Sequence, residues 1–537
     1  MELGKIYHMG REEKADLILN RQAMASHTFV TGSTGTGKSN AVYHLLDEIT
    51  KDGRTSFLVV EPAKGEYKNV FGSRADVKVF GTNPRETPLL RINPFAFPQD
   101  IHILEHIDRL VEIFNACWPM YAAMPAVLKD AIERSYQKAG WDLRNSESEK
   151  GGFPTFFDLL DILPGVIEES HYSKDTQSDY VGALCTRVKS LTNGIYGSVF
   201  CAEDALSDAE LFDCNVVVDL SRVGSMETKS LLMGILVMKL QEYRMCGSEM
   251  NSRLRHVTVL EEAHNLLRKT SAEQSQEGAN LQGKSVEMLA NAIAEMRTYG
   301  EGFIIADQAP GLLDMSVIRN TNTKIILRLP DEEDRKLVGK SAALKEAQID
   351  ELSKLPLGVA AVYQNEWPEA VLCKIEAYPM PENAVYHKPS KMPHEINAEF
   401  VFGQLAAGKE LEPLSISEME QLKLWLKRHE MMLKPEDGRY LEQVFAGGEL
   451  DVAKTRKAVF DFFGGISTVV DYCAAAEKSF TPRKEFLEQL QGQYGLKAAA
   501  ADWVLNSVIS MGMSLNPDAK AVDNLRTNFE QQGGRVL

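Results

Sequence analysis

Short runs of apolar, β-branched residues alternate with amphipathic stretches along the first 380 residues of the chain. Such runs are typical of buried parallel strands, which have apolar neighbours on both faces and are joined by crossover helices. We predict strands at residues 28–31, 56–61, 77–80, 215–220, 256–260, 303–306, 324–329 and 358–364. The pattern therefore predicts an α/β fold built on a mostly parallel sheet.

The strand pattern stops between residues 99 and 212. Segments 101–114 and 126–138 instead have apolar positions at helical spacing, and residues 145–152 form a break rich in glycine and charge. We interpret this region as a helical insertion. Closely spaced prolines at 379, 381, 389 and 393 then predict a linker and a domain boundary near residues 380–395. The predicted divisions are a core in two parts, 1–98 and 213–380, the insertion at 99–212, and a C-terminal helical domain at 381–537.

The C-terminal region has helical periodicity, notably at residues 418–432 and 483–491. Turn signals stand at 435–438 and 447–448, and the alanine run 498–501 is most simply a helix. The region has no catalytic constellation, and its aromatic residues are expected to build a core, with a partner-docking surface as the alternative. These residues are Trp425, Trp503, Phe460, Phe462 and Phe463.

Composition and charge narrow the class of protein. The chain of 537 residues is 44% hydrophobic and 25% charged, which excludes a disordered or coiled-coil protein. Its 59 Lys and Arg against 76 Asp and Glu give a net charge of -17, so any DNA contact must be a local basic feature. The 7 cysteines are scattered and form no C-x-x-C pair, which argues against a disulfide framework or a thiolate zinc site.

The compartment is predicted from the same residues. Scattered cysteines fit a reducing cytoplasm, and residues 1–11 lack the apolar core of a signal peptide. Apolar runs such as 231–240 fall short of the roughly 18–20 residues that a membrane span needs. We therefore expect a cytoplasmic protein, attached to a membrane only through partners, if at all.

A phosphate-binding loop stands near the N-terminus. The segment Gly32-Ser33-Thr34-Gly35-Thr36-Gly37-Lys38-Ser39 fits the pattern G-x-x-x-x-G-K-[ST], with a predicted strand before it and a helix after it. Its glycines let backbone N–H groups approach phosphate oxygens, Lys38 should reach the β- and γ-phosphates, and Ser39 should ligate Mg²⁺. The segment, with the following Asn40, predicts a P-loop NTPase that binds a nucleotide with Mg²⁺.

An acidic pair follows a second buried strand. Glu261 and Glu262 end the apolar run 256–260, so both carboxylates are expected beside the P-loop. Glu261 would hold Mg²⁺ through water, and Glu262 would orient or deprotonate the attacking water. His264 lacks zinc-site spacing with the pair, which favours a structural or sensor hydrogen bond.

Three further polar residues fit the recognition of the γ-phosphate. Gln308 follows the strand at 303–306 and could sense the phosphate or position water. Arg297 ends a helical segment, and Arg328 lies in the apolar run 325–329, where an arginine needs a partner. Each arginine is either a finger that completes a neighbouring subunit's site or a member of an intrachain salt bridge.

Together these motifs resemble the HerA/FtsK superfamily of ring-forming P-loop ATPases. The resemblance is closest to its HerA branch, which includes bacterial members paired with defence effectors, and it covers about residues 3–375. It is carried by the order and spacing of segments 27–40, 60–67, 90–95, 260–264, 294–300, 307–310 and 325–329.

The resemblance implies a homohexamer that hydrolyses ATP at subunit interfaces and moves double-stranded DNA through a central channel. It further implies an effector partner, such as a nuclease or a sirtuin-like NADase, in bacterial antiviral defence or DNA repair. The roles that carry over are phosphate and Mg²⁺ binding for Lys38 and Ser39, catalysis for Glu262, sensing for Gln308, and the trans arginine for Arg297 or Arg328.

The chain departs from the family pattern in two places. HerA proteins usually begin with a small β-barrel, but Gly32 comes too early to leave room for one, so this member lacks it or the chain starts late. That departure puts the docking of a partner in doubt. Ala309 stands where many relatives have an arginine, which would weaken or relocate one contact to the γ-phosphate.

DNA translocation also requires cationic loops that face the pore. The alternative for each candidate is an ordinary solvated charge. The candidates are Arg85, Arg91, Arg268, Lys269 and Lys284.

Two other functions remain open. A secretion-type motor ATPase, such as those of conjugative type IV systems, would share the Asn-Pro-Phe at residues 93–95 and the acidic pair. Alternatively, ATP binding could build a ring scaffold that activates an effector without moving DNA.

Overall fold

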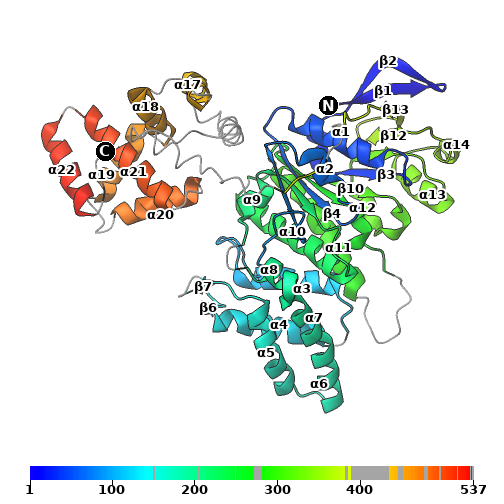
Figure 1. Ribbon diagram of the computed structural model, residues 1–537, viewed down its shortest axis with the longest axis horizontal. Coiled ribbons are helices and arrows are strands. Elements are labelled where there is room, and N and C mark those ends of the chain that lie inside the picture. The colour runs from blue at the N-terminus through cyan, green and yellow to red at the C-terminus, as the bar shows by residue number, and fades with distance from the viewer. Residues whose placement is uncertain are drawn as a thin grey trace. The chain divides into compact units, whose positions relative to one another are not determined.

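A computed structural model describes most of the chain, in two compact units, Met1–Lys388 and Pro389–Leu537. The described residues of the first unit are 1–121, 123–148, 152–202, 205–247, 249–270, 281–380 and 385–388. Those of the second are 435–445, 451–463, 465–476, 482–494, 498–516, 518–532 and 534. The first unit carries the large sheet, and the second is helical (Figure 1).

The first unit is built on an 11-stranded sheet in the order β2-β1-β13-β12-β11-β3-β10-β9-β4-β8-β5. Neighbouring strands from β11 through β5 pair in parallel, whereas β12, β13, β1 and β2 continue the sheet in antiparallel pairs. The α/β fold with a mostly parallel sheet is therefore confirmed. The strands are β1 (Glu2–His8), β2 (Arg11–Ile18), β3 (Thr28–Thr31), β4 (Ser56–Glu61), β5 (Val77–Gly81), β8 (Asn215–Asp219), β9 (His256–Glu261), β10 (Glu301–Asp307), β11 (Thr323–Ile326), β12 (Val359–Gln364) and β13 (Val371–Ile375).

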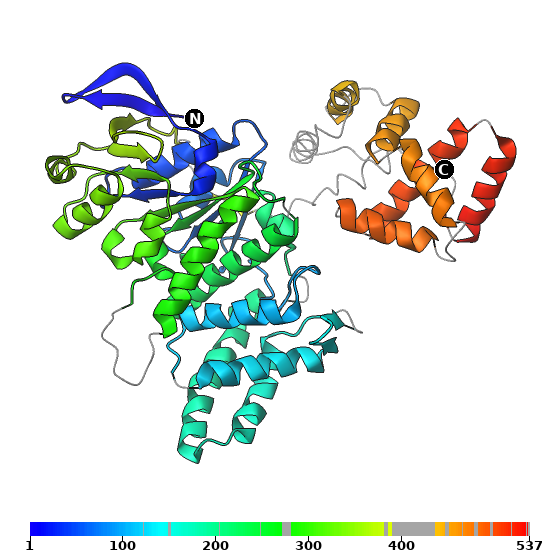
Figure 2. The same ribbon diagram turned by 180° about the vertical axis from the view of Figure 1, so that it is seen from behind.

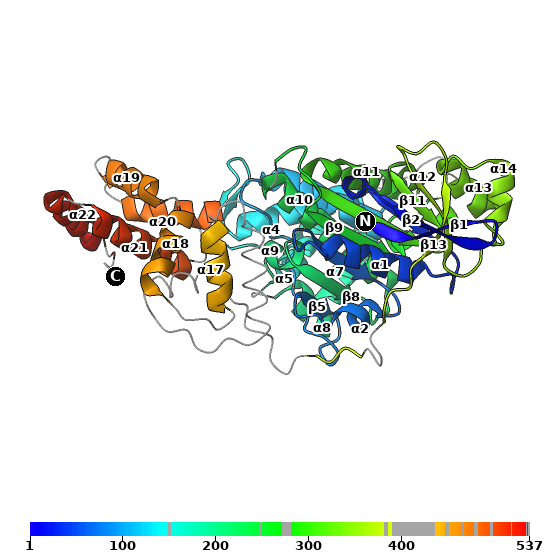
Figure 3. The same cartoon turned by 90° about the horizontal axis from the view of Figure 1, so that it is seen from above.

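The predicted strands are all present, but the pattern missed β1, β2 and β13. Most residues of β2 are exposed because it is the edge strand, so it has no apolar run to recognise (Figure 3). One prediction was wrong in extent, since β11 ends at Ile326 and does not continue to residue 329. The remaining apolar residues of that run belong to the connection that follows the strand.

Two hydrophobic cores hold the sheet, one on each face. Side chains alternate between them along each strand, so Leu58 and Val60 join one core while Phe57 and Val59 join the other. Helices α1 (Lys38–Thr50) and α2 (Tyr67–Phe71) cover one face, and α3 (Ile103–Cys117), α10 (Met226–Gly247) and α11 (Leu281–Glu295) cover the other (Figures 1 and 2). Each fully buried large apolar side chain contributes about 1.5–3 kcal/mol, so both layers fix the sheet.

The insertion between β5 and β8 is mostly helical. Its helix α3 packs against α10 and α11 and ties the insertion to the core of the sheet. A short hairpin, β6 (Trp141–Asp142) with β7 (Glu147–Ser148), lies where only a break was expected. The remaining helices are α4 (Met124–Lys138), α5 (Phe156–Glu169), α6 (Lys174–Tyr180), a π-helical turn (Val181–Cys185), α7 (Thr186–Thr192), α8 (Gly194–Phe200) and α9 (Asp208–Phe212).

Short helices in the connections between strands complete the first unit. They are the 3-10 turns η1 (Gln22–Ser26), η3 (Ala263–Asn265), η4 (Met296–Tyr299) and η5 (Pro310–Leu312), with α12 (Met315–Arg319), α13 (Glu332–Ser341) and α14 (Glu346–Glu351). Among them, η3 and η4 flank strands β9 and β10 and carry residues of the predicted site.

The second unit contains α17 (Pro435–Phe445), α18 (Val452–Phe462), α19 (Gly465–Ala476), α20 (Pro482–Tyr494), α21 (Ala498–Leu515) and α22 (Ala519–Gln531). The turn expected at 435–438 is wrong, because these residues form the first turn of α17, where a proline is tolerated. Phe460, Phe462 and Phe463 are buried and build the core, as predicted. The predicted helix 418–432, the turn at 447–448, Trp425 and the side chain of Trp503 lie outside the described residues.

A helix that crosses a membrane needs about 20 mostly apolar residues. In the described part of the chain, no single helix is both long and apolar enough to cross a bilayer. Only a pair of helices bent by 65°, Ala453–Phe462 with Gly465–Ala476, meets the criterion together, by length and composition alone.

Candidate active site

The strand order brings the predicted motifs to one edge of the sheet. Strands β3, β10, β9 and β4 are consecutive and parallel, so the segments that follow them emerge side by side. Thr31, before the P-loop, pairs with Asp307, and Ala306 pairs with Glu261. This carboxyl edge is where ligands bind in open α/β sheets.

A cleft of about 290 Å³ lies at this edge. The P-loop lines the cleft together with Glu262 of the acidic pair and Gln308 of the loop after β10. Its lining residues are Ser33, Thr34, Gly35, Gly37, Lys38, Ser39, Asn40, Lys64, Glu262, Gln308 and Leu357.

Glycine is required at several points of the P-loop. Gly35 and Gly37 have φ values of 75° and 105°, which side-chain-bearing residues rarely adopt. A Cβ atom on Gly32 would lie 2.7 Å from Cβ of Leu327 and 2.7 Å from Oγ1 of Thr36. The loop therefore curves tightly and turns into α1 at Lys38.

Lys38 and Glu261 form a buried ion pair beneath the cleft. Nζ of Lys38 donates to Oε2 of Glu261 at 2.5 Å, and the hydroxyl of Tyr67 donates to Oε1 of Glu261 at 2.5 Å. Burial alone would lower the pKa of Lys38, but the neighbouring Glu261 carboxylate raises it above the ordinary value. The lysine is therefore charged and already aimed at the cleft that its P-loop encloses.

Glu262 has a carboxylate oxygen that lacks a hydrogen-bond partner in the described part of the chain, although it lies 3.6 Å from Nδ1 of His264. Its side chain is only 12% exposed, and Oε2 is buried with no hydrogen-bond partner among the described residues. Burial raises the pKa of Glu262, the Lys38 charge opposes that rise, and the Asp307 charge adds to it. A desolvated, unpaired carboxylate that lines a cleft is well suited to accept a proton.

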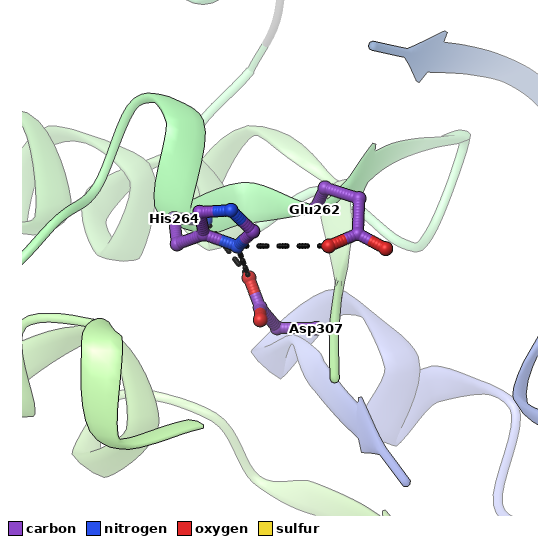
Figure 4. Close-up of side chains that lie close together, drawn as sticks. All are labelled: Glu262, His264 and Asp307. Carbon is purple, nitrogen blue, oxygen red and sulfur yellow. Dashed lines mark hydrogen bonds and ion pairs between the residues drawn. The ribbon is translucent and has the colours of Figure 1, made fainter. Parts of the chain in front are cut away.

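His264 and Asp307 lie next to Glu262 (Figure 4). The backbone N–H of His264 donates to Oδ2 of Asp307 at 2.9 Å, and Nδ1 of His264 is also 2.9 Å from Oδ2. The Asp307 hydrogen bond and charge raise the pKa of His264. His264 is thus hydrogen-bonded to a carboxylate from a neighbouring strand, which the spacing of the acidic pair alone could not reveal.

Gln308 contacts the P-loop directly, because Oγ1 of Thr34 donates to Oε1 of Gln308 at 2.9 Å. Asn40, although it lines the cleft, uses its side chain elsewhere. Its Nδ2 donates to the carbonyl of Glu376 at 2.9 Å, and its Oδ1 accepts from the N–H of Tyr378 at 2.8 Å. Asn40 therefore anchors the segment after β13 to α1.

Known proteins match both the sequence and the fold. Residues 1–149 match the family model described as the central domain of helicase HerA. The chain is 25% identical over 387 residues to the DNA double-strand break repair helicase HerA of Sulfolobus acidocaldarius, covering 70% of this chain and 69% of the relative. The HerA of Sulfurisphaera tokodaii is 23% identical over 384 residues, again 70% and 69% of the two chains.

The chain is thus similar to HerA-like ATPases of the HerA/FtsK superfamily.

Solved structures show the same fold at lower identity. VirB4 of Thermoanaerobacter pseudethanolicus superposes with a TM-score of 0.54 at 19% identity, over 71% of this chain and 96% of that one. The plasmid coupling protein TrwB, solved with ADP and Mg²⁺, gives a TM-score of 0.50 at 15% identity, over 71% and 96%.

The two candidate arginines of the chain lie in different places. Arg297 is exposed in η4, just before β10 begins, whereas the cleft lies beyond the other end of that strand. Arg328 is exposed after β11, and its carbonyl accepts from the N–H of Ser33 at 3.0 Å and from its Oγ at 3.1 Å. The expectation that Arg328 lies within a strand is wrong, because β11 has already ended at Ile326. No ion pair of Arg328 is present among the described residues.

Two further residues of the site, Glu61 and Lys64, had no role predicted from the sequence. Glu61 accepts from the N–H groups of Glu66 and Tyr67 at 2.7 and 3.0 Å and so holds the loop after β4. Burial raises the pKa of Glu61 to about 8, although those two N–H groups act against the rise. Lys64 in this loop lines the cleft with a left-handed φ of 63°. The matching segment 60–67 of the family pattern was the signal that could have found them.

The residues present fit a nucleotide with Mg²⁺. Ser39 lines the cleft at the start of α1, and the buried unpaired oxygen of Glu262 shows that the cleft is built for a further polar group. Carboxylate and hydroxyl oxygens are the ligands that Mg²⁺ prefers. Ser39, with Glu261 acting through water, would hold the ion, which neutralises charge on the phosphates when bound.

Proposed function

We propose that the chain hydrolyses ATP in this cleft as one subunit of a homohexamer and uses the energy to move double-stranded DNA. We further propose a nuclease or another effector as a partner, in bacterial antiviral defence or DNA repair. One observation carries the proposal: a P-loop, a buried acidic pair and an amide sensor converge on a single cleft. The HerA relatives are DNA double-strand break repair helicases by name, which supports the choice of DNA as the substrate to be moved.

The roles follow from what each side chain contacts. Lys38 exchanges its pair with Glu261 for phosphate oxygens, and Glu262 accepts a proton from the attacking water through the oxygen that lacks a partner. Gln308 orients that water from the side of the P-loop. Lys64 supplies a second positive charge at the phosphates, since among the described residues its ion pair is a long one, 3.8 Å from Glu66.

The ring is supported by the position of Arg297. Strand β10 spans 7 residues, or about 20 Å, so Arg297 at its start cannot reach the nucleotide of its own chain. An arginine finger at this position must therefore act on a neighbouring subunit. Arg328, beside its own P-loop, is the second candidate for a contact across the interface.

DNA binding requires a local basic surface on an acidic chain. Arg268 and Lys269 are exposed directly after the η3 turn and are the leading candidates for the pore. Lys284 and Arg85 are also exposed, whereas Arg91 is half-buried. Phosphate contacts from such a stripe weaken steeply as salt rises.

The decisive experiment measures steady-state ATP hydrolysis of the full chain with and without linear duplex DNA at low salt. Light scattering on the same samples reports the assembly state, and Glu262→Gln is the blank. DNA-stimulated turnover in a hexamer supports the translocase. ATP turnover that does not change with DNA, or an assembled ring without turnover, contradicts the translocase and favours the scaffold. Turnover that depends on a membrane partner favours the secretion-type motor.

A pair of charge variants sharpens this experiment. Arg268→Ala with Lys269→Ala should abolish the stimulation by DNA while leaving basal turnover unchanged. The matched control is Arg11→Ala with Lys14→Ala, which removes the same two charges from the exposed edge strand β2. Equal effects of the two pairs would reject the pore assignment.

A further inference from the structure

Asp307 joins two segments of the site through its two carboxylate oxygens. Its side chain is fully buried at the end of β10. Oδ1 accepts from the backbone N–H of Ala309 at 2.9 Å, whereas Oδ2 accepts from the backbone N–H of His264 and lies 2.9 Å from Nδ1 of the same residue. One carboxylate thus connects the loop that carries Gln308 to the turn that carries Glu262.

The turn that it holds is strained. Glu262 has φ 46° and ψ 50°, a left-handed conformation that costs a non-glycine residue about 1–3 kcal/mol and persists only where the surroundings impose it. Asn265 imposes part of it, since its backbone N–H and its Nδ2 donate to the carbonyl of Glu262 at 2.9 and 2.7 Å. The bonds of His264 to Asp307 supply the rest and tie the turn to β10.

The side chain of Glu262 has no such support of its own. Its Oε2 is buried without a hydrogen-bond partner and lies 3.6 Å from Nδ1 of His264, beyond hydrogen-bond reach (Figure 4). The position of the carboxylate is therefore set by the backbone of the turn. Displacement of a reacting group by about 1 Å costs on the order of 10²-fold in rate, so the support of this turn matters for catalysis.

We propose that His264 and Asp307 are positioning residues that lock the turn of Glu262 to the loop of Gln308. The two groups then meet the γ-phosphate and the attacking water as one rigid unit. Neither positioning residue needs to touch the nucleotide. The inference rests on the proposed function, because it assigns the support of the carboxylate that performs hydrolysis.

A cation site is the competing interpretation of the same cluster. One ligand atom from each of Glu262, His264 and Asp307 lies within 4.8 Å of the others. However, the two oxygens of Asp307 already face three nitrogen atoms, two backbone N–H groups and the imidazole Nδ1. Because these contacts use Asp307 as an acceptor of hydrogen bonds, we favour positioning over chelation.

The test compares His264→Ala with His264→Asn in the full chain. Loss of the imidazole should lower kcat by about 10–100-fold, since the carboxylate shifts, while KM for ATP changes by no more than about twofold. Asparagine can donate from near the position of Nδ1 and should recover most of the lost kcat. In Asp307→Asn, an NH₂ group that cannot accept a hydrogen bond replaces one carboxylate oxygen and faces an N–H donor. This variant should therefore show the same selective loss of kcat.

Two controls separate positioning from general damage. His102→Ala also removes a hydrogen-bonded histidine, at the N-cap of α3, and should leave kcat unchanged. In a Glu262→Gln background, His264→Ala should cause no further loss, because both changes act through one carboxylate. A full additional loss would overturn the inference.

The outcomes distinguish this inference from the function on which it rests. If Glu262→Gln hydrolyses ATP at the normal rate, the catalytic assignment itself fails. If Glu262→Gln is inactive but His264→Ala has normal kcat, only the inference fails. It also fails if calorimetry with Zn²⁺ alone detects one bound ion per chain that His264→Ala abolishes, because the cluster would then be a cation site.

Discussion

Strands β9 and β10 carry buried carboxylates at both ends, and the two ends differ in how these groups are paired. At the start of the strands, Glu301 is surrounded by donors: Nδ1 of His256 at 2.7 Å, Oγ1 of Thr258 at 2.8 Å and Nε of Arg244 at 3.0 Å. At the far end, Glu262 has a buried oxygen with no hydrogen-bond partner among the described residues. The same two strands thus carry one carboxylate that accepts several hydrogen bonds and another with an oxygen that accepts none.

The pKa of the buried carboxylate is lowered at one end of the strands and raised at the other. Burial alone would raise the pKa of Glu301, but His256 and Arg244 lower it to about 2. Burial raises the pKa of Glu262 and brings that of Glu61, at the end of β4, to about 8. Paired carboxylates stabilise the fold, whereas an unpaired one at a cleft is available for chemistry. The predictions below test this difference between the two ends.

The largest effect is expected at the cleft. Glu262→Gln removes the proton acceptor and should lower kcat for ATP by about 10²–10⁴-fold, the usual contribution of a general base. Stability should stay the same or rise, because the change removes a desolvated charge. Stopped ATP turnover with normal nucleotide binding and an unchanged thermal midpoint would support the contrast, and a destabilised protein would contradict it.

The opposite end should respond in the opposite way. Glu301→Gln removes one of the two carboxylates that pair with Arg244, whose side chain is 2% exposed. It should destabilise the unit by at most about 3–5 kcal/mol, because the 2.9 Å pair with Asp213 remains. Turnover per folded molecule should remain normal. Denaturant unfolding measures the first quantity and active-site titration the second. A folded but inactive variant would show that this end also takes part in catalysis.

Stability should depend on pH in two separate windows. Glu301 has a folded-state pKa of about 2 against an ordinary value of 4.5, so its contribution is present above pH 4.5 and is lost as pH falls toward 2. Glu61 has a raised pKa of about 8, so its contribution is present below pH 4.5 and is lost as pH rises toward 8. Unfolding curves across pH should lose the first slope in Glu301→Gln and the second in Glu61→Gln. Retention of both slopes in either variant would rule out that assignment.

The smallest effect concerns the sensor. Thr34→Val removes the 2.9 Å hydrogen bond to Gln308 and keeps the shape of the side chain. We expect a change of about two- to tenfold in kcat/KM, since one such bond contributes about 0.5–1.5 kcal/mol. Thr50→Val on α1 is the matched control, since it loses bonds to two helix carbonyls and a 3.4 Å bond from Arg74, all away from Gln308. Identical kinetics for both variants would show that the bond does not position Gln308.

Local pattern was sufficient for much of the fold and for part of the site. The P-loop glycines, the apolar strands and the acidic pair could be recognised because each is a short segment whose chemistry depends on its immediate neighbours. The pattern failed at β2, whose exposed edge has no apolar run, and at Arg328, where an apolar run continues beyond the end of its strand. Burial, which arises from distant segments, decided both cases.

The sequence by itself determined that a phosphate-binding loop and a pair of carboxylates follow two strands of one parallel sheet. Only the tertiary structure decided which carboxylate is paired. Lys38 and Tyr67 occupy Glu261, so Glu262 is left with the unpartnered oxygen, and Asp307 reaches the turn from a neighbouring strand. The physical reason is that hydrogen bonds and desolvation depend on distances between segments far apart in the chain, which local patterns do not encode.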